Sequence, residues 1–294
     1  MDQLKPEDIA RVKGMGFLRN RGTDLFSGRV VAHGTVFTAA ELSVVAQISE
    51  QFGNGKVAFS TRMTAEIVGI AYDRIDAARA YLRAHTRLDF GGTGARVRPI
   101  VACKGTTCVY GNCDTQKIAS DMHDAFYLGM ADIKLGHKFK IAVGGCPNSC
   151  VKPSLNDFSV EGHRAPKVDL SKCRGCKTCQ VETRCPSRAA RVEQGKLAID
   201  PTKCVTCGVC VGKCPFGAVA PESDCTFFVY VGGTWGKSKR VGTLLSRTYA
   251  EAELVPLCEK CLLWFRENGL AKERFGVAID RVGFDQFEMA LNAT

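Results

Sequence analysis

The chain has 294 residues, of which 45% are hydrophobic and 24% charged, and its formal net charge is +10. This composition is typical of a globular protein of two or three domains and excludes a disordered or fibrous chain. No apolar run approaches the ~18 residues of a transmembrane helix, and the acidic start MDQLKPEDIARVKG is no secretory signal. We therefore expect a cytoplasmic protein, in which sixteen cysteines favour metal ligation over disulfides. The positive charge would suit non-specific attraction to nucleic acid, but no nucleic-acid motif accompanies it.

The first part of the chain predicts alternating helices and strands. A capping box, Thr38 to Glu41, opens a helix that should stop at Gly53. Apolar periodicity predicts two further helices, and the β-branched run KVAFST predicts a strand. The three helices are expected at residues 38–52, 72–85 and 115–130, and the strand at residues 56–61.

Two cysteine runs follow between residues 173 and 215. The second run, CVTCGVCVGKCP, has the spacing C-x2-C-x2-C-x3-C-P, and the first, CRGCKTCQVETRCP, has five residues before its last cysteine. Together they resemble a bacterial two-cluster ferredoxin, in which the last cysteine of each run ligates the other cluster. The resemblance implies one [4Fe–4S] cluster on Cys173, Cys176, Cys179 and Cys214, and a second on Cys204, Cys207, Cys210 and Cys185. Zinc is the alternative, but zinc sites use paired C-x-x-C elbows rather than triplets followed by Cys-Pro.

The segments on either side of these runs predict strands. SLNDFSVEGHR before them and CTFFVYVGGTWG after them are alternating and rich in β-branched and aromatic residues. The cysteine-rich unit, residues 167–221, is therefore expected as an insertion between neighbouring strands of a larger domain.

Two further cysteine pairs lie before the insertion. ACKGTTC supplies Cys103 and Cys108, and GGCPNSC supplies Cys146 and Cys150. Two separated pairs can hold one [4Fe–4S] cluster, and a thiolate is also an axial ligand for a haem-type iron. A C-x4-C pair followed by GCPNxC resembles the sulfite and nitrite reductase family, which couples such a cluster to sirohaem. The resemblance implies that these four cysteines hold the cluster and that Cys150 is shared with the sirohaem iron.

Basic residues match the family's anion-binding positions. FSTRMT and RVRPIVAC place Arg62 and Arg98 there, with Arg96 less favoured, and HKFKIAV supplies Lys138 and Lys140. Residues two apart in a strand point to the same face, so both lysines should enter one pocket. Four converging cations would hold the sulfite dianion, the arginines in bidentate fashion, and the lysines would supply protons. The alternative is an exposed basic strand face.

The family resemblance also gives candidate sirohaem contacts. VGGTWGKSKRVG is a Gly-rich basic loop suited to the many carboxylates of sirohaem. LAKERFGVAIDRVGFDQF resembles the C-terminal signature of the catalytic subunit of anaerobic, assimilatory-type sulfite reductases, which also carry the inserted ferredoxin unit. The candidate contacts are Lys104, Thr106, Thr107, Asn148, Gly233, Lys237, Lys239 and Arg240.

Four cysteines remain outside these sets. Cys113 and Cys225 are expected to be small core residues. Cys258 and Cys261 form a C-x-x-C within an amphipathic helix, and they have no partner pair with which to complete a metal site.

The resemblance implies an α+β fold of three parts. These are an N-terminal ferredoxin-like half domain (residues 1–90), a catalytic domain for sirohaem and its coupled [4Fe–4S] cluster (91–166 and 222–294), and the inserted two-cluster ferredoxin (167–221). The implied activity is six-electron reduction of sulfite to sulfide. No nucleotide or flavin fingerprint is visible, so electrons should come from flavin- and iron–sulfur-containing partner subunits. An ammonia-forming nitrite reductase and a non-catalytic electron-transfer subunit are the alternatives.

Overall fold

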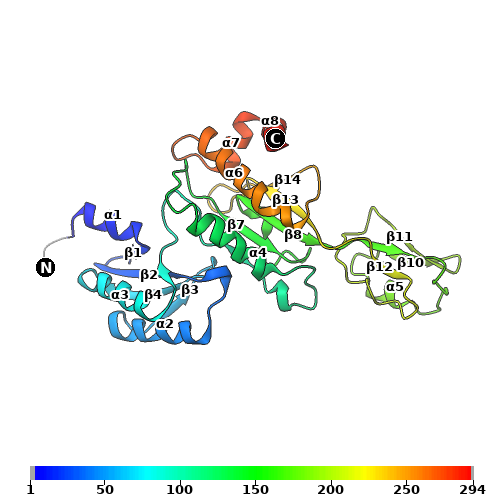
Figure 1. Cartoon of the computed structure of the whole chain (residues 1–294), viewed down its shortest axis with the longest axis horizontal. Helices are drawn as coiled ribbons and strands as arrows, with labels where there is room; N and C mark the ends of the chain where they lie inside the picture. Colours follow the sequence, from blue (N-terminus) through cyan, green and yellow to red (C-terminus); the bar gives the residue numbers. More distant parts are fainter. Residues whose placement is uncertain (1–3, 293–294) are drawn as a thin grey trace.

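The computed structural model describes residues 4–292 as a mixed α+β fold. Figure 1 shows an N-terminal sheet at the left, a central sheet, and a smaller cysteine-rich unit at the right. Residues 1–3 and 293–294, at the ends of the expected domains, lie outside the described part. Within residues 4–292, no helix has both the length and the apolar character needed to cross a membrane.

The N-terminal sheet is antiparallel, with strand order β1-β2-β4-β3 and β5 paired to β2. The predicted capping box is confirmed, since the Thr38 hydroxyl accepts from the Glu41 amide (3.2 Å) and the Glu41 carboxylate accepts from the Thr38 amide (2.8 Å). Helices α2 and α3 and strand β3 lie where the sequence predicts them. The elements are α1 (Pro6–Gly14), β1 (Phe17–Arg19), β2 (Leu25–Val31), η1 (His33–Thr35), α2 (Ala39–Phe52), β3 (Val57–Phe59), β4 (Ala65–Ala71), η2 (Tyr72–Arg74), α3 (Ile75–His85) and β5 (Asp89–Phe90).

The central sheet has the strand order β14-β13-β8-β7-β6. Strands β6, β7 and β8 are parallel, whereas β13 pairs antiparallel with both β8 and β14. The predicted third helix is α4, which continues as one π-helical segment, η4. The elements are β6 (Val101–Ala102), η3 (Gly105–Thr107), α4 (Thr115–Met122), η4 (His123–Leu128), β7 (Ile141–Gly144), η5 (Pro153–Leu155), β8 (Phe158–His163), β13 (Thr226–Val231), β14 (Thr243–Leu244), η6 (Glu251–Glu253), α6 (Leu254–Asn268), α7 (Phe275–Val282) and α8 (Phe284–Asn292).

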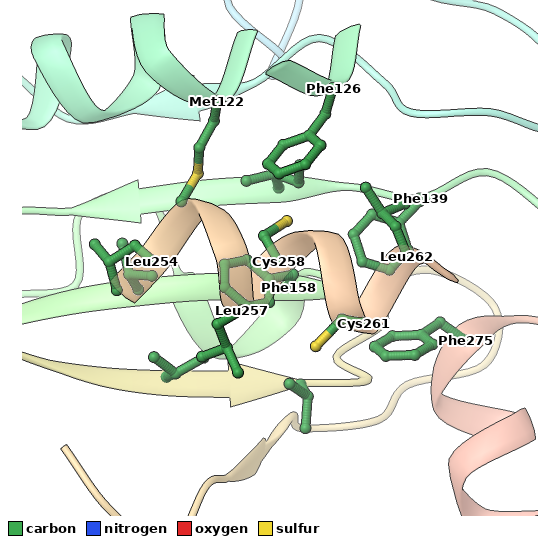
Figure 2. Close-up of a cluster of buried hydrophobic side chains, with 14 of the residues drawn as sticks. Met122, Phe126, Phe139, Phe158, Leu254, Leu257, Cys258, Cys261, Leu262 and Phe275 are labelled. Atoms are coloured by element: carbon green, nitrogen blue, oxygen red, sulfur yellow. The ribbon is translucent and has the colours of Figure 1, made fainter. Parts of the chain in front are cut away.

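Helix α6 covers the core of this central domain. Figure 2 shows Cys258 and Cys261 pointing from α6 into side chains that include Phe158 and Phe275. Both thiols have no exposed surface, and burial raises the pKa of each. A group that is buried in apolar surroundings with a raised pKa stays a neutral thiol, so this C-x-x-C is core packing.

The cysteine-rich unit leaves and re-enters the central sheet between two adjacent strands. Strand β9 follows β8 directly, β12 directly precedes β13, and β9 and β12 pair with each other as β8 and β13 do. The unit therefore stands on a two-stranded neck, which is visible at the right of Figure 1. Its elements are β9 (Pro166–Val168), α5 (Gln180–Arg184), β10 (Ala190–Glu193), β11 (Lys196–Ile199) and β12 (Val219–Pro221).

Candidate active site

Four cysteines gather at the carboxyl ends of two parallel strands. Cys103 follows β6 and Cys146 follows β7, and these strands are hydrogen-bonded neighbours. Burial, and then the nearby thiols of Cys103, Cys150 and Cys108, raises the pKa of Cys146. The Gly145 amide donates to Cys103 Sγ at 3.3 Å. The sequence's two separated pairs thus meet at one place.

Glycine lets the two cysteine loops come together. A Cβ on Gly145 would lie 3.1 Å from Gly105 Cα and 2.9 Å from Thr115 Cγ2. Since real Cβ atoms rarely approach that closely, a side chain here would push the loops apart.

The donor set fits an iron–sulfur cube. It offers four thiols with a backbone amide aimed at one sulfur, and hydrogen bonds to sulfur are among the features that tune such clusters. Four sulfurs around a single zinc ion would stand about 3.8 Å apart, from a Zn–S length of ~2.3 Å. In the described part of the chain, no three His, Cys, Asp or Glu side chains converge closely enough to hold one metal ion. The four cysteines therefore do not form a site for a single zinc ion.

A second set of four cysteines lies in the inserted unit. Cys185, Cys204, Cys207 and Cys210 line one small cavity. Burial, and then the other three thiols, raises the pKa of Cys210 to about 11. The last cysteine of the first run therefore lies with the triplet of the second run, which is the crossed arrangement that the ferredoxin resemblance implies.

Three of the four cysteines implied for the other cluster pack on the small core of the inserted unit. Cys173, Cys179 and Cys214 pack on the cluster of Val181, Ala190, Leu197 and Val219. The Leu197 amide donates to Cys173 Sγ at 3.3 Å. Cys185 and Cys210 pack on the same cluster, so this small core lies among cysteines of both runs.

The four predicted anion-binding residues line one cavity of about 300 Å³. Lys138 and Lys140 lie in the segment before β7. Arg62 lies in the turn between β3 and β4 of the N-terminal sheet, and Arg98 lies between β5 and β6. The cavity also includes Arg29, which the sequence analysis did not single out. The Arg29 guanidinium donates to Glu66 at 2.8 and 2.7 Å, so its charge is neutralised locally.

The two lysine ammonium groups lie among more positive than negative neighbours, with Asp157 as the carboxylate that raises their pKa values. Burial, and then Arg62, Arg274 and Lys138, lowers the pKa of Lys140 to about 8. Burial, Arg274 and Arg98 also lower the pKa of Lys138. Among residues 4–292 neither ammonium has a hydrogen-bond or ion-pair partner. Between them Phe139 is fully buried, with its ring 5.1 Å from that of Phe275, so the lysines share the opposite, cavity-facing side.

The two arginines differ in what they can still bind. Arg62 Nη2 donates to the carbonyls of Pro99 (2.5 Å) and Ile141 (3.0 Å), and Nη1 donates to Asn156 Oδ1 (2.7 Å). With both Nη2 hydrogens used, neither bidentate face of Arg62 is available. The expectation that both arginines bind an anion through two hydrogen bonds each is therefore wrong for Arg62. Its guanidinium instead joins the turn between β3 and β4 to the central domain.

Arg98 retains a free bidentate face. Its Nη1 donates to the Gly92 carbonyl, while its buried Nε has no partner in the described residues. Burial, and then Arg29 and Arg96, lowers the pKa of Arg98 to about 10. A buried donor without a partner costs free energy unless a ligand accepts from it.

A buried ion pair that is not among the predicted site residues holds the backbone of Lys140. Arg274 Nη2 donates to both oxygens of Asp157, at 2.9 and 2.8 Å, across 117 residues of chain. The Asp157 side chain has no exposed surface and also accepts from the Lys140 amide at 2.9 Å. Arg274 lies within the LAKERFG segment, and the resemblance of that segment to the family is the one sequence feature that could have indicated a role for Arg274.

Some of the candidate sirohaem contacts are exposed to solvent, whereas the polar groups of others are already hydrogen-bonded to the protein. Lys104, Thr107, Asn148, Lys237 and Cys150 are exposed, and Lys239 is exposed with its ammonium 5.1 Å from the Trp235 ring centroid. Gly233 has no room for a side chain, because a Cβ would lie 2.4 Å from the Ser154 carbonyl oxygen.

Two of these candidates have structural partners instead. Arg240 donates to both oxygens of Asp280, at 2.9 and 2.6 Å, and to the Gly232 carbonyl at 3.1 Å. The Thr106 hydroxyl donates to Asp114 (2.6 Å) and accepts from the Gln116 amide (3.0 Å) at the start of α4. Both residues therefore shape their loops, and neither has its polar group free for a cofactor.

Comparisons with known proteins agree with this architecture. A model of the nitrite and sulphite reductase 4Fe-4S domain matches residues 93–293, and one of the nitrite/sulfite reductase ferredoxin-like half domain matches residues 19–85. Because the first match covers more than half of it, the chain belongs to the nitrite and sulfite reductase family.

Individual relatives are similar over part of their length. The coenzyme F420-dependent sulfite reductase of Methanocaldococcus jannaschii is 30% identical over 250 residues, 84% of this chain and 39% of that protein. One subunit of the anaerobic sulfite reductase of Salmonella typhimurium is 30% identical over 178 residues, 54% of this chain and 49% of that protein. The chain thus spans half or less of both relatives. The crystal structure of dissimilatory sulfite reductase I has the same fold, with a TM-score of 0.75 at 22% identity over 92% of this chain and 69% of that one.

Proposed function

We propose that this chain reduces sulfite to sulfide with six electrons, at a sirohaem coupled to a [4Fe–4S] cluster. The observation that carries the proposal is the cavity that brings together Arg62, Arg98, Lys138 and Lys140. It stands at the amino end of β7, and the Cys146 loop stands at the carboxyl end of the same strand. A catalyst that reduces a small dianion needs both an oxyanion pocket and an electron-delivering centre.

The cysteines divide into three cluster sites in this proposal. Cys103, Cys108, Cys146 and Cys150 would hold the coupled cluster, and Cys150, which is exposed, would also hold the sirohaem. Sirohaem would supply the iron macrocycle that takes electrons and binds the sulfur atom of the substrate. Lys104, Thr107, Asn148, Gly233, Lys237 and Lys239 remain the proposed contacts to it.

The chain's own residues hold the anion and supply protons. Lys138, Lys140 and the open face of Arg98 bind the sulfite oxygens through charge-assisted hydrogen bonds. Conversion of sulfite to sulfide releases three oxygens as water and consumes six protons with the six electrons. Because its pKa is lowered to about 8, Lys140 can give up a proton near neutral pH more readily than an ordinary lysine.

Electrons are proposed to reach this site through the inserted unit. Residues 167–221 would hold two [4Fe–4S] clusters, on Cys173, Cys176, Cys179 and Cys214 and on Cys204, Cys207, Cys210 and Cys185. Residues 1–90 would form the ferredoxin-like half domain, and residues 91–166 with 222–294 the catalytic domain. Separate subunits that carry flavin and iron–sulfur centres would be the donors.

Turnover of the anaerobically purified chain with reduced viologen tests the proposal. Sulfide production from sulfite, with a higher kcat/KM than for nitrite, is expected, since four cations favour a dianion over a monoanion. Ammonia formation from nitrite as the more efficient reaction would make the chain a nitrite reductase. Loaded iron–sulfur clusters with neither reaction would make it an electron-transfer subunit.

A further inference from the structure

A hydrogen-bonded chain of four side chains, buried at its middle, joins the loop of the coupled cluster to one loop of the inserted unit. Ser149, between Cys146 and Cys150, donates its hydroxyl to Glu161 Oε2. Glu161 Oε1 pairs with His163 Nε2 at 3.1 Å, and His163 Nδ1 pairs with the hydroxyl of Thr206 at 2.6 Å. Thr206 stands between Cys204 and Cys207.

The middle of this chain is shielded from water. The side chains of Glu161 and His163 are 7% and 5% exposed, and the His163 ring stacks on Phe228 with 3.8 Å between centroids. A carboxylate accepts hydrogen bonds, so His163 Nε2 donates to it, and Nδ1 of a neutral ring then accepts from the Thr206 hydroxyl. Every polar atom of the chain is thereby satisfied, which is the condition under which a buried polar network becomes rigid.

The loop backbones at both ends are held in an unusual conformation. Ser149 and Thr206 have positive φ angles of 51° and 49°, which non-glycine residues rarely adopt. Such conformations persist where surrounding contacts over-determine them. Here, the contacts in question are the hydrogen bond from Ser149 to Glu161 and the one between Thr206 and His163.

A second contact runs beside the first. The Asn112 amide donates to the Gly145 carbonyl at 2.9 Å, and its side-chain Nδ2 donates to the Cys207 carbonyl at 3.3 Å. Asn112 thus touches the residue before Cys146 and a cysteine of the inserted unit. In the described residues, no hydrogen bond joins the central sheet to the loops of Cys173, Cys176, Cys179 or Cys214.

We infer that Glu161 and His163 are positioning residues that fix the Cys204–Cys210 loop relative to the Cys146–Cys150 loop. As a result, the site of Cys185, Cys204, Cys207 and Cys210 is the electron relay nearest to the catalytic centre. This inference rests on the proposed function. Each electron that leaves a proximal cluster would enter the coupled cluster, and the four side chains form no bond and move no proton. The site of Cys173, Cys176, Cys179 and Cys214 then lies outermost, toward the donor.

Two matched threonine variants test the bridge in the cofactor-loaded full chain. Thr206→Val keeps the side-chain shape and removes the hydroxyl that reaches His163. Thr202→Val makes the same change four residues earlier, at an exposed threonine whose hydroxyl donates to Asp200 at 2.6 Å. Thr206→Ser restores a hydroxyl at the bridge.

Two measurements follow the electrons. Photoreduced flavin delivers an electron to the inserted unit, and the absorbance of the tetrapyrrole reports its arrival. Electron paramagnetic resonance of the dithionite-reduced protein reports the magnetic interaction between neighbouring clusters. Loss of one buried hydrogen bond should shift the population of the held loop about 5- to 30-fold. We expect Thr206→Val to slow transfer by up to that factor and to weaken the interaction, while Thr202→Val and Thr206→Ser behave as wild type.

Wild-type transfer and a wild-type spectrum in Thr206→Val would overturn the inference. If Thr206→Val loses iron, Ser149→Ala repeats the test from the other end of the chain, with the same expected and contrary results. If the protein binds no tetrapyrrole, the proposed function fails, and the magnetic interaction between clusters still decides whether the bridge couples them.

Discussion

Lys140 offers a test in which stability and binding change in opposite directions. Its pKa falls from 10.5 to about 8, chiefly through burial and then through Arg62 and Arg274. That shift corresponds to at most about 3.4 kcal/mol against the charged form at neutral pH. Because the ammonium is only half buried, water screens part of this, and we expect about 1–2 kcal/mol. Replacing it with the apolar Lys140→Met should therefore raise the free energy of unfolding by about 1–2 kcal/mol.

The same substitution should damage anion binding. A hydrogen bond to a charged group contributes about 1.5–3 kcal/mol, so the Kd for sulfite should rise about 10- to 150-fold. Denaturant unfolding and a sulfite titration of the loaded protein measure the two effects. Lys134→Met, which removes an exposed lysine from the segment before β7, is the matched control and should change neither. A Lys140→Met protein that is less stable and binds sulfite normally would refute the reasoning.

Further outcomes are expected at the cavity, the core and the inserted unit. Sulfite affinity should fall about tenfold per pH unit above pH 8, as Lys140 loses its proton, and a sulfite titration from pH 7 to 10 measures this fall. Without ligand, the free energy of unfolding should instead rise from about pH 8 to 10.5, because the unfolded chain binds more protons than the folded chain in that range. Denaturant unfolding across the same range measures this rise. Asp157→Asn should cost about 3–5 kcal/mol in denaturant unfolding, because it leaves Arg274 buried without its countercharge. Cys258→Ala should lower stability by about 1–3 kcal/mol and leave the iron content unchanged, whereas Cys146→Ala should lose iron. Replacing residues 167–221 with a short linker should leave tetrapyrrole bound and abolish turnover driven by the partner subunits.

Each of these has a contrary result. A flat sulfite affinity above pH 8 would remove Lys140 from the binding site. A neutral Asp157→Asn would mean that the Arg274 ion pair contributes little, and iron loss in Cys258→Ala would make that C-x-x-C a metal site. Retained partner-driven turnover after the deletion would refute the electron route through the inserted unit.

Short spacings and neighbouring parallel strands explain why predicted cysteines come together in the fold. That these cysteines ligate clusters stays a prediction. Cys103 and Cys146 meet because β6 and β7 are adjacent, and Cys185 crosses to the second triplet as the ferredoxin resemblance implies. The helices that begin at Thr38 and run through 72–85 were likewise predictable from caps and periodicity.

The roles of individual basic residues were not predictable in the same way. Arg240 and Arg62 carry the expected charge at the expected places, but each is occupied by partners that only the folded chain brings near. The Asp157–Arg274 pair joins residues 117 apart, and no local pattern signals it. Whether a cation is free or paired depends on long-range contacts, and local spacing does not encode these.

The optical spectrum of the anaerobically purified chain, recorded with and without sulfite, tests the central claim most directly. The account predicts a chlorin-like red band that shifts when sulfite is added, and its loss in Cys150→Ala while the iron–sulfur absorption of the inserted unit remains. A spectrum with iron–sulfur bands alone, unchanged by sulfite, would contradict it.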